Sequence, residues 1–515
     1  MKKFRMIILL ICLLCIIPTV NASLNDSDVS QTVNNKIIDG NTDNNNLDSR
    51  NTNSITEYNN NNISYKLIDN TDDSSYKNIK SNSNTNTVKH SSKIVVSNLT
   101  ATYSDKVLLR TTVVDKTLND YVYNGKVLYK INGITVGTSN IKNGKAFFVY
   151  DTSSLKSGKY TISAVYAGSS TVNSNRANGT LTINKIASRL VLSNVNVKTN
   201  TSTTLSVKVY DSKNRLVDGG IVVFKVNGIS ISQATVKGGA ASITYTPLNV
   251  VRNYTLSAVY GGTTRYASST ANSKLIVSLK IYTINWLSKG NIKKNTVLYN
   301  SLPKTAITNE LVNCASYATP YVILGDGNGK CVFVVAGIHG NELSSQLAAV
   351  RLINNLCTKT VHGTVYIFPF VAPSYTGNIT RTLNGVNLNS VAHKSGTLSN
   401  KLVNFAKSRG AVSLGDFHCT QPGGKPGRNA VFGSYNPLRE SATLSKYIST
   451  KTSSSSIVYN KAGVEYPGAV EDYCNKRGIV SVTCEVKTPH GSIASGSSEK
   501  SYSMMNSYLN YYKLI

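Results

Sequence analysis

The alternation of hydrophobic and polar positions divides the chain into two parts with different expected folds. Between residues 91 and 279, apolar residues alternate with polar ones, as at Leu205, Val207 and Val209, and turn residues follow at short intervals. A period of two is typical of antiparallel strands with one buried face. After about residue 280, apolar runs alternate with stretches of helical spacing, which predicts an α/β domain with a mainly parallel sheet.

The alternating region contains an internal repeat of about 95 residues. The sequence Lys130-Ile-Asn-Gly133 recurs as Lys225-Val-Asn-Gly228, and the alternating tyrosine-rich segment 160–166 recurs at 254–260. The Asn-Gly steps fit two-residue hairpin turns. We therefore predict two all-β sandwiches, over residues 91–184 and 185–279. They resemble bacterial-type immunoglobulin-like domains of adhesin-like surface proteins, a resemblance that implies spacing or adhesion.

For residues 280–515 the pattern predicts strands and helices that alternate along the chain. The predicted strands cover 321–324, 331–335, 364–370, 411–417 and 479–485, and the predicted helices cover 342–356, 398–408 and 469–476.

The first 22 residues have the features of a secretory signal peptide. A basic start with Lys2, Lys3 and Arg5 precedes an apolar run over 7–17, which ends at Pro18 and is too short to span a membrane. Residues 23–90 are crowded with Asn, Ser, Asp and Thr, which predicts a disordered linker. We therefore expect a secreted protein, associated with the cell surface or cell wall, without a transmembrane span once the signal is removed.

The formal net charge is +30, but the basic residues are scattered and are not interleaved with aromatic residues. This distribution argues against nucleic acid as a partner. It favours a solvated basic surface, with salt-sensitive attraction to anionic wall polymers or acidic peptides.

One turn in the α/β region carries candidate chemistry. The apolar run 332–335 breaks at Gly337, and His339 and Glu342 follow before apolar residues recur at helical spacing. Ligands of open α/β sheets gather beyond the carboxyl ends of strands. An imidazole and a carboxylate on one such turn can reach one cation, and zinc takes both while keeping a position for water.

Two later strand ends supply further groups. The predicted strand 411–417 leads into Asp416-Phe417-His418, and the predicted strand 479–485 ends in Thr483-Cys484-Glu485. Two histidines and a carboxylate around a metal ion, with a second carboxylate left free, suit metal-assisted hydrolysis. The free carboxylate takes the proton of the attacking water and passes it to the leaving amine.

In this order, the sequences Gly337-Ile-His-Gly-Asn-Glu342, Asn387-Leu-Asn389, Asp416-Phe-His418 and Thr483-Cys-Glu485 resemble zinc carboxypeptidases. The closest branch is the succinylglutamate desuccinylase/aspartoacylase-like one, and the resemblance covers about residues 305–507. It implies a three-layer α/β domain that binds one zinc ion.

By position, the resemblance implies that His339, Glu342 and His418 bind zinc and that Glu485 is the general base and acid. It also implies that Arg381 polarises the scissile carbonyl.

Asn389 would contact the substrate carboxylate. One departure is that the family's Asp-Leu-Asn-Arg reads Asn387-Leu-Asn-Ser390, so the arginine that grips a terminal carboxylate is missing. Arg428, in a glycine-rich loop, is a candidate to replace it, unless it is a solvated loop residue. Tyr466 is a further candidate substrate contact.

The sequence therefore favours an exported zinc hydrolase of amide bonds, a metallo(carboxy)peptidase acting on murein or pseudomurein peptides of a cell wall. Three alternatives stay open. The domain could be a deacylase of N-acyl amino acids, or it could belong to an adhesin and only bind peptide or glycan. It could also be a cysteine peptidase that uses Cys419 or Cys484.

Overall fold

The computed structural model describes residues 88–285 and 288–515. The predicted signal peptide and most of the predicted linker therefore lie outside the described residues. The linker was predicted to reach residue 90, but His90 already forms a bridge with Val172. Among the described residues, no helix has the length and apolar character needed to cross a bilayer.

Residues 92–184 form strands with a hydrophobic core of their own, which includes Leu109, Tyr129 and Tyr166. In one sheet β3 pairs with β1, β4 and β7, and in the other the order is β2-β9-β8-β5-β6. The strands are β1 (Ser92–Val96), β2 (Leu99–Thr102), β3 (Lys106–Asp115), β4 (Asp120–Tyr121), β5 (Lys126–Ile131), β6 (Ile134–Asn140), β7 (Lys145–Asp151), β8 (Gly158–Tyr166) and β9 (Asn175–Asn184).

Residues 188–278 form a second set of strands around a separate core, which includes Leu205, Phe224 and Tyr260. The sheet orders are β10-β12-β15 and β11-β17-β16-β13-β14. The strands are β10 (Ser188–Leu192), β11 (Val195–Lys198), β12 (Thr203–Asp211), β13 (Ile221–Val226), β14 (Ile229–Thr235), β15 (Ala240–Tyr245), β16 (Arg252–Tyr260) and β17 (Ser269–Ser278).

The two sets repeat one hairpin in detail. Asn132 and Asn227 have φ of 46° and 47°, and the glycine after each also has positive φ, as a tight two-residue turn requires. The hairpins share an irregularity in register, between Tyr129 and Lys130 in one and between Phe224 and Lys225 in the other. The predicted hairpin turns are therefore confirmed at both positions.

The C-terminal part is an α/β domain whose sheet is mixed. The strand order is β18-β19-β21-β20-β22-β25-β23-β24. The strands are β18 (Ile281–Ile284), β19 (Thr319–Leu324), β20 (Cys331–Ala336), β21 (Thr364–Phe368), β22 (Ser413–Thr420), β23 (Ala430–Asn436), β24 (Ser455–Lys461) and β25 (Val480–Lys487). The central strands β21, β20, β22 and β25 are parallel, whereas β19 and β23 join them in the antiparallel sense.

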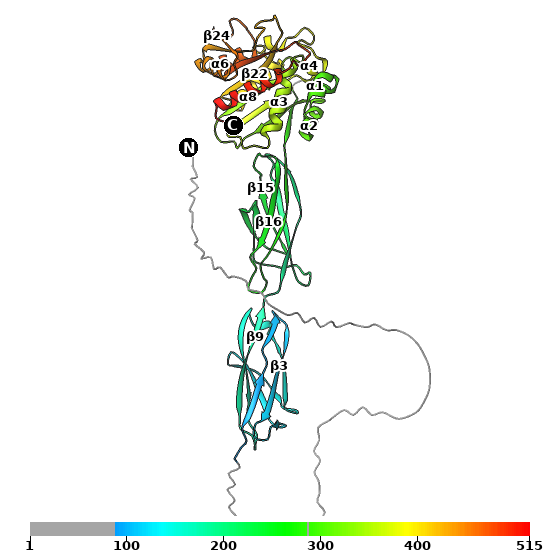
Figure 1. Cartoon of the computed structure of the whole chain (residues 1–515), viewed down its shortest axis with the longest axis vertical. Coiled ribbons are helices and arrows are strands. Elements are labelled where there is room, and N and C mark those ends of the chain that lie inside the picture. Colours follow the sequence, from blue (N-terminus) through cyan, green and yellow to red (C-terminus); the bar gives the residue numbers. More distant parts are fainter. Residues whose placement is uncertain (1–87, 286–287) are drawn as a thin grey trace, which may run out of the picture. The chain divides into compact units, whose positions relative to one another are not determined.

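Helices cover both faces of this sheet, and successive residues of a strand serve opposite faces. In β20, Val332 and Val334 pack in the core with α3 and α8, while Phe333 and Val335 pack in the core with α5 and α7. Figure 1 shows α3 and α8 alongside β22, and α6 beside β24. The helices are α1 (Thr296–Ser301), α2 (Ala306–Ala315), α3 (Leu343–Leu356), α4 (Pro373–Asn378), α5 (Leu398–Ser408), α6 (Arg439–Lys451), α7 (Val470–Lys476) and α8 (Ser497–Tyr511).

The topology brings three strand ends together. Strands β20 and β25 both pair with β22 in the parallel sense, so their carboxyl ends meet at one edge. The register places His418 directly opposite Glu485. The turn after β20, which carries His339, lies at the same edge.

Candidate metal centre

The turn between β20 and α3 is shaped by two glycines. Gly337 has φ of 81°, a left-handed conformation that an L side chain rarely adopts. At Gly340 the backbone of α4 passes so close that a Cβ atom would lie 1.9 Å from the carbonyl carbon of Tyr375. The turn that presents His339 and Glu342 therefore depends on glycine at both positions.

Gln346, which sequence reasoning overlooked, holds this turn from inside the domain. Its side chain is fully buried, and its amide nitrogen donates to the carbonyl oxygens of His339, Gly340 and Glu342 at 3.0–3.4 Å. Its amide oxygen accepts from the hydroxyl of Thr376 at 2.7 Å. A glutamine between the apolar residues Leu343 and Leu347, at the start of α3, was the only sequence signal for this role.

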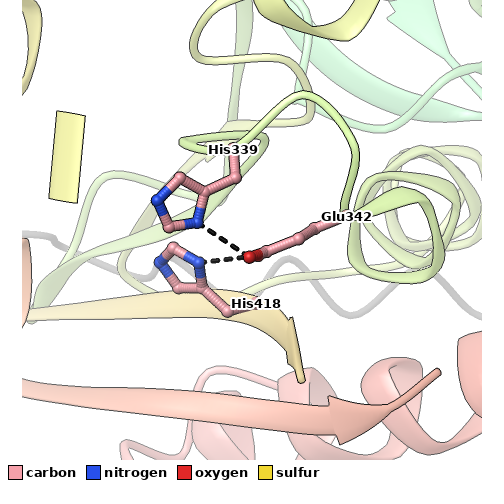
Figure 2. Close-up of side chains that lie close together, drawn as sticks. All are labelled: His339, Glu342 and His418. Atoms are coloured by element: carbon pink, nitrogen blue, oxygen red, sulfur yellow. Dashed lines mark hydrogen bonds and ion pairs between the residues drawn. The ribbon is translucent and has the colours of Figure 1, made fainter. Parts of the chain in front are cut away.

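His339, Glu342 and His418 form one buried cluster. Oε1 of Glu342 lies 2.7 Å from Nδ1 of His339, and its other oxygen lies 2.7 Å from Nδ1 of His418. One donor atom from each residue lies within 4.8 Å of the others, a spacing that could hold a metal ion. Figure 2 shows both imidazoles pointing at the carboxylate from two different elements.

The other nitrogen of each imidazole faces an acceptor oxygen. Nε2 of His339 lies 2.8 Å from Oδ1 of Asn387, and Nε2 of His418 lies 2.8 Å from Oδ2 of Asp416. The second contact departs from good hydrogen-bond geometry, although the two groups are close. These oxygens only accept, so they favour the tautomers that carry the proton on Nε2 and leave a lone pair on Nδ1.

This arrangement fits a cation between the three residues. Two Nδ1 lone pairs aimed at a carboxylate are favourable only with positive charge among them, from a metal ion or from added protons. Two imidazole nitrogens and one carboxylate are a donor set that zinc accepts. Asn387 and Asp416 would then orient the imidazoles, a role that the sequence did not assign to either residue.

The electrostatics of the cluster agree with this interpretation. Burial opposes ionisation of Glu342, but the two imidazoles outweigh it and hold the pKa of Glu342 well below its usual range. Burial also lowers the pKa of His418, but the carboxylates of Asp416 and Glu342 outweigh it and leave that pKa well above the usual value. The pocket therefore favours an ionised Glu342 with a cation beside it.

Glu485 and Arg381 lie beside the cluster. Arg381 donates from Nη1 to Oε1 of Glu342 at 2.6 Å, and its side chain is 43% exposed. Oε2 of Glu485 is buried without a hydrogen-bond partner among the described residues. Burial and the carboxylate of Glu342 raise the pKa of Glu485 to about 8, against the opposing charges of His418 and Arg381. A carboxylate with a pKa near neutrality is suited to accept and return a proton.

Two cavities open next to this pair. The loop chamber has a volume of about 380 Å³ and is lined by Arg381, residues 419–425, Glu485 and His490. The aromatic chamber has a volume of about 450 Å³, and its walls include Phe432 and Tyr466. Both chambers contain Arg381, Lys425 and Glu485.

Two of the three predicted substrate contacts line a chamber. Asn389 and Tyr466 both line the aromatic chamber, as does Ser390. The amide oxygen of Asn389 accepts from the backbone of Val470 at 2.9 Å, so its NH₂ group is the part left for a ligand.

Arg428 lines neither chamber, and its Nε donates to the hydroxyl of Ser455 at 3.1 Å. The expectation that Arg428 replaces the missing carboxylate-binding arginine therefore has no support from its position. Lys425, three residues earlier on the same loop, lines both chambers, as Arg381 does.

Cys419 and Cys484, the two candidate nucleophiles, lack the features of a nucleophilic centre. In the part of the chain that the structure describes, all six cysteines are free thiols. Burial raises the pKa values of Cys419 and Cys484 well above the usual range, which disfavours the reactive thiolate. Cys419 Sγ has its hydrogen-bond contact with Ser345, not with an imidazole. The cysteine-peptidase alternative is therefore disfavoured.

Comparison with known protein families locates two domains in the chain. Residues 190–278 match the family described as bacterial Ig-like domain (group 3). Residues 328–423 match the succinylglutamate desuccinylase/aspartoacylase catalytic domain. The resemblance expected from the sequence motifs is thus confirmed, with the catalytic-domain match at the C-terminal side of the Ig-like match. No curated protein matches the chain.

Several solved structures resemble the chain. A succinylglutamate desuccinylase from Silicibacter sp. is 18% identical with a TM-score of 0.33, over 39% of this chain and 62% of that one. A succinylglutamate desuccinylase/aspartoacylase from Rhodobacter sphaeroides is 20% identical with a TM-score of 0.32, over 39% and 61%. The ectoine utilization protein EutE (DoeB) from Ruegeria pomeroyi is 16% identical with a TM-score of 0.33, over 39% and 64%. The chain thus spans less than two thirds of each of these structures.

Proposed function

We propose that residues 280–515 form a zinc-dependent hydrolase of amide bonds, acting on peptides. The observation that carries this proposal is the carboxylate of Glu342 held between the Nδ1 atoms of two imidazoles, with Glu485 and Arg381 beside it. The match of residues 328–423 to a catalytic domain of acyl-amide hydrolases supports it.

His339, Glu342 and His418 would hold the zinc ion, which when bound supplies a Lewis acid and a water of lowered pKa. Asn387 and Asp416 keep the two imidazoles in the tautomers that present Nδ1. Glu485 takes the proton of the attacking water at its carboxylate and gives it to the leaving amine. Arg381 donates to the carbonyl oxygen as negative charge develops there.

The substrate class is the part of the proposal that the family leaves open. The family match covers desuccinylases and aspartoacylases, so a deacylase of N-acyl amino acids is the second candidate. We favour a peptide because Ser390 stands where the resemblance expects a carboxylate-binding arginine, and Arg428 does not take its place. The preferred source is the cross-linking or stem peptide of a murein or pseudomurein cell wall.

We further propose that the protein is exported and acts at the cell surface or in the cell wall. The Ig-like match of residues 190–278 supports a surface location, and the first 22 residues have a signal-peptide pattern. Residues 92–184 would be a second Ig-like domain, because their sheets, apart from the short strand β4, repeat the strand orders and the hairpin of residues 188–278. Together they would space the hydrolase from its attachment.

The test asks whether the zinc-loaded full chain hydrolyses three kinds of substrate. These are isolated wall sacculi, defined wall-type peptides and N-acyl amino acids. Release of amino groups from sacculi or peptides, abolished by a chelator and by Glu485→Gln, is the expected result. Faster hydrolysis of N-acyl amino acids would favour the deacylase. Binding of peptide or glycan without hydrolysis, and equally by wild type and Glu485→Gln, would favour a non-catalytic adhesin domain.

A further inference from the structure

The pair Arg381 and Glu485 stands at the junction of two chambers and not at the end of one. Both residues line the loop chamber and the aromatic chamber, as does Lys425. Volumes of about 380 and 450 Å³ each fall within the ordinary range for a ligand site. A single acylated amino acid needs only one of them, whereas a chain that continues beyond the scissile bond needs both.

The two chambers differ in charge once the three shared residues are set aside. The remaining lining of the loop chamber has no carboxylate and presents Gln421, His490 and the main chain of two glycines. The remaining lining of the aromatic chamber contains two carboxylates, Glu465 and Glu471, and no cationic side chain.

Glu471 is fixed in place. It is 4% exposed, and its Oε1 accepts from Nδ2 of Asn475, one helical turn later, at 2.6 Å. Asn475 is itself held, since its Oδ1 accepts from the backbone of Ser481 on β25 at 2.8 Å. Burial and the adjacent carboxylate of Asp472 raise the pKa of Glu471. A positive group in the chamber would favour its ionised form.

The lining of this chamber is also aromatic in part, through Phe432 and Tyr466. Tyr466 is 44% exposed and packs edge-to-face on Phe432 and Tyr459, with ring centroids 6.0 and 5.6 Å away. An aromatic face attracts an ammonium group and also packs against the methylene chain that carries one. An aromatic surface and a buried carboxylate in one chamber suit a long side chain that ends in an amine.

We propose that the substrate is a peptide that lies through both chambers, with a lysine-like residue bearing a free amine in the aromatic chamber against Glu471. This inference rests on the proposed amide hydrolysis and specifies its substrate. The scissile bond then joins the amine-bearing residue to the segment that lies in the loop chamber. A small acylated amino acid, or a residue with an acidic side chain, fits this arrangement poorly.

The experiment measures binding to the zinc-loaded full chain carrying Glu485→Gln, so that turnover does not interfere. Calorimetry compares three probes: an alanine-based pentapeptide with one central lysine, the same peptide with norleucine, and N-acetyl-lysine. We expect the lysine peptide to bind about tenfold more tightly than either other probe. Adding Glu471→Gln should abolish the preference for lysine over norleucine, whereas adding Glu440→Gln, an exposed residue of α6 outside both chambers, should preserve it.

Equal binding of the lysine and norleucine peptides would overturn the proposal, and so would a preference that survives Glu471→Gln. Binding of N-acetyl-lysine as tight as that of the lysine peptide would also overturn it, because one chamber would then suffice. Circular dichroism and zinc content of each variant show whether the fold and the metal centre are intact. The amide-hydrolase function is judged separately, from turnover by wild type, so the two can fail independently.

Discussion

Nδ1 of His418 lies 2.7 Å from Oε2 of Glu342, although 76 residues separate them in the chain. Pairing of β20 with β22 produces this contact, since it places the end of one strand beside the turn that follows the other. The backbone N–H of Cys419 donates to the same oxygen at 3.0 Å and fixes its position. A carboxylate ordered in this way is prepared to share a cation with the imidazoles.

Glu485→Gln should remove activity without removing metal. The glutamine amide can neither accept nor return a proton, so we expect kcat to fall about 10²–10⁴-fold. Zinc content should equal that of wild type, because Glu485 is outside the cluster of three donors. Assays on the best peptide substrate, with metal analysis of the same samples, test this. A variant with wild-type kcat would remove Glu485 from the reaction.

The same substitution should stabilise the metal-free protein at alkaline pH. The pKa of Glu485 is about 8 in the folded protein, against an ordinary value of 4.5. Between pH 4.5 and pH 8, the carboxyl group is therefore protonated in the folded state but ionised in the unfolded state. Stability therefore falls as pH rises from about 4.5 to 8. Glu485→Gln should relieve this loss, on the order of 1–4 kcal/mol at pH 8.

Thermal unfolding of metal-stripped wild type and Glu485→Gln measures the effect. The two melting temperatures should be similar at pH 4.5 and differ by several degrees at pH 8, with the variant higher. A difference that does not depend on pH would contradict the raised pKa.

Asp416→Asn should weaken metal binding. Asp416 faces Nε2 of His418 at 2.8 Å and favours the tautomer that presents Nδ1 to the metal. Loss of such an orienting carboxylate typically costs about 10–100-fold in metal affinity. Competition with a fluorescent zinc chelator measures it. Asp326→Asn is the matched control. Asp326 also contacts an imidazole, that of His362, but in a solvated loop far from the centre. Equal zinc affinities for the two variants would refute the orienting role of Asp416.

Arg381→Ala and Arg428→Ala should behave differently. Arg381 lines both chambers and contacts Glu342, so its loss should lower kcat about 10²–10³-fold, as for a donor that stabilises an oxyanion. Arg428 lines neither chamber, so its loss should change kcat and KM less than about twofold. Steady-state kinetics of the two variants tests this prediction. An effect of Arg428→Ala larger than about twofold would show that the group that binds the substrate carboxylate lies on the loop of Arg428.

The central parallel strands and the metal-site turn could be predicted because their signals are local. The run Val332–Val335 is buried on both faces of the sheet, and the glycines of the following turn are required by a left-handed φ and by the close approach of α4. The helix predicted over 398–408 has the bounds observed for α5, because its apolar residues recur at helical spacing.

Helices α6 and α8 and strands β23 and β24 were not predicted. The inner faces of the two helices are built largely from small polar residues, such as Ser441, Ser445 and Ser498, which are buried although they read as solvent-facing. Their hydroxyl groups find acceptors across the packing, as Ser441 does at the carbonyl oxygen of Ser481. Hydrophobic periodicity cannot reveal a face of this kind.

The site residues likewise differ in whether the sequence alone could identify them. The cluster of His339, Glu342 and His418 follows from motifs at strand ends, whereas the support from Asn387, Asp416 and Gln346 depends on distances that only the folded chain sets. Arg428 was considered because of its charge and loop, but the backbone directs it toward Ser455.

The most direct test of the metal centre is anomalous diffraction at the zinc edge from crystals of the full chain grown with zinc. A single strong peak should lie about 2.0–2.2 Å from Nδ1 of His339, Nδ1 of His418 and a carboxylate oxygen of Glu342. Absence of a peak there at full zinc loading, with Glu342 still hydrogen-bonded to both imidazoles, would contradict a metal centre at this cluster.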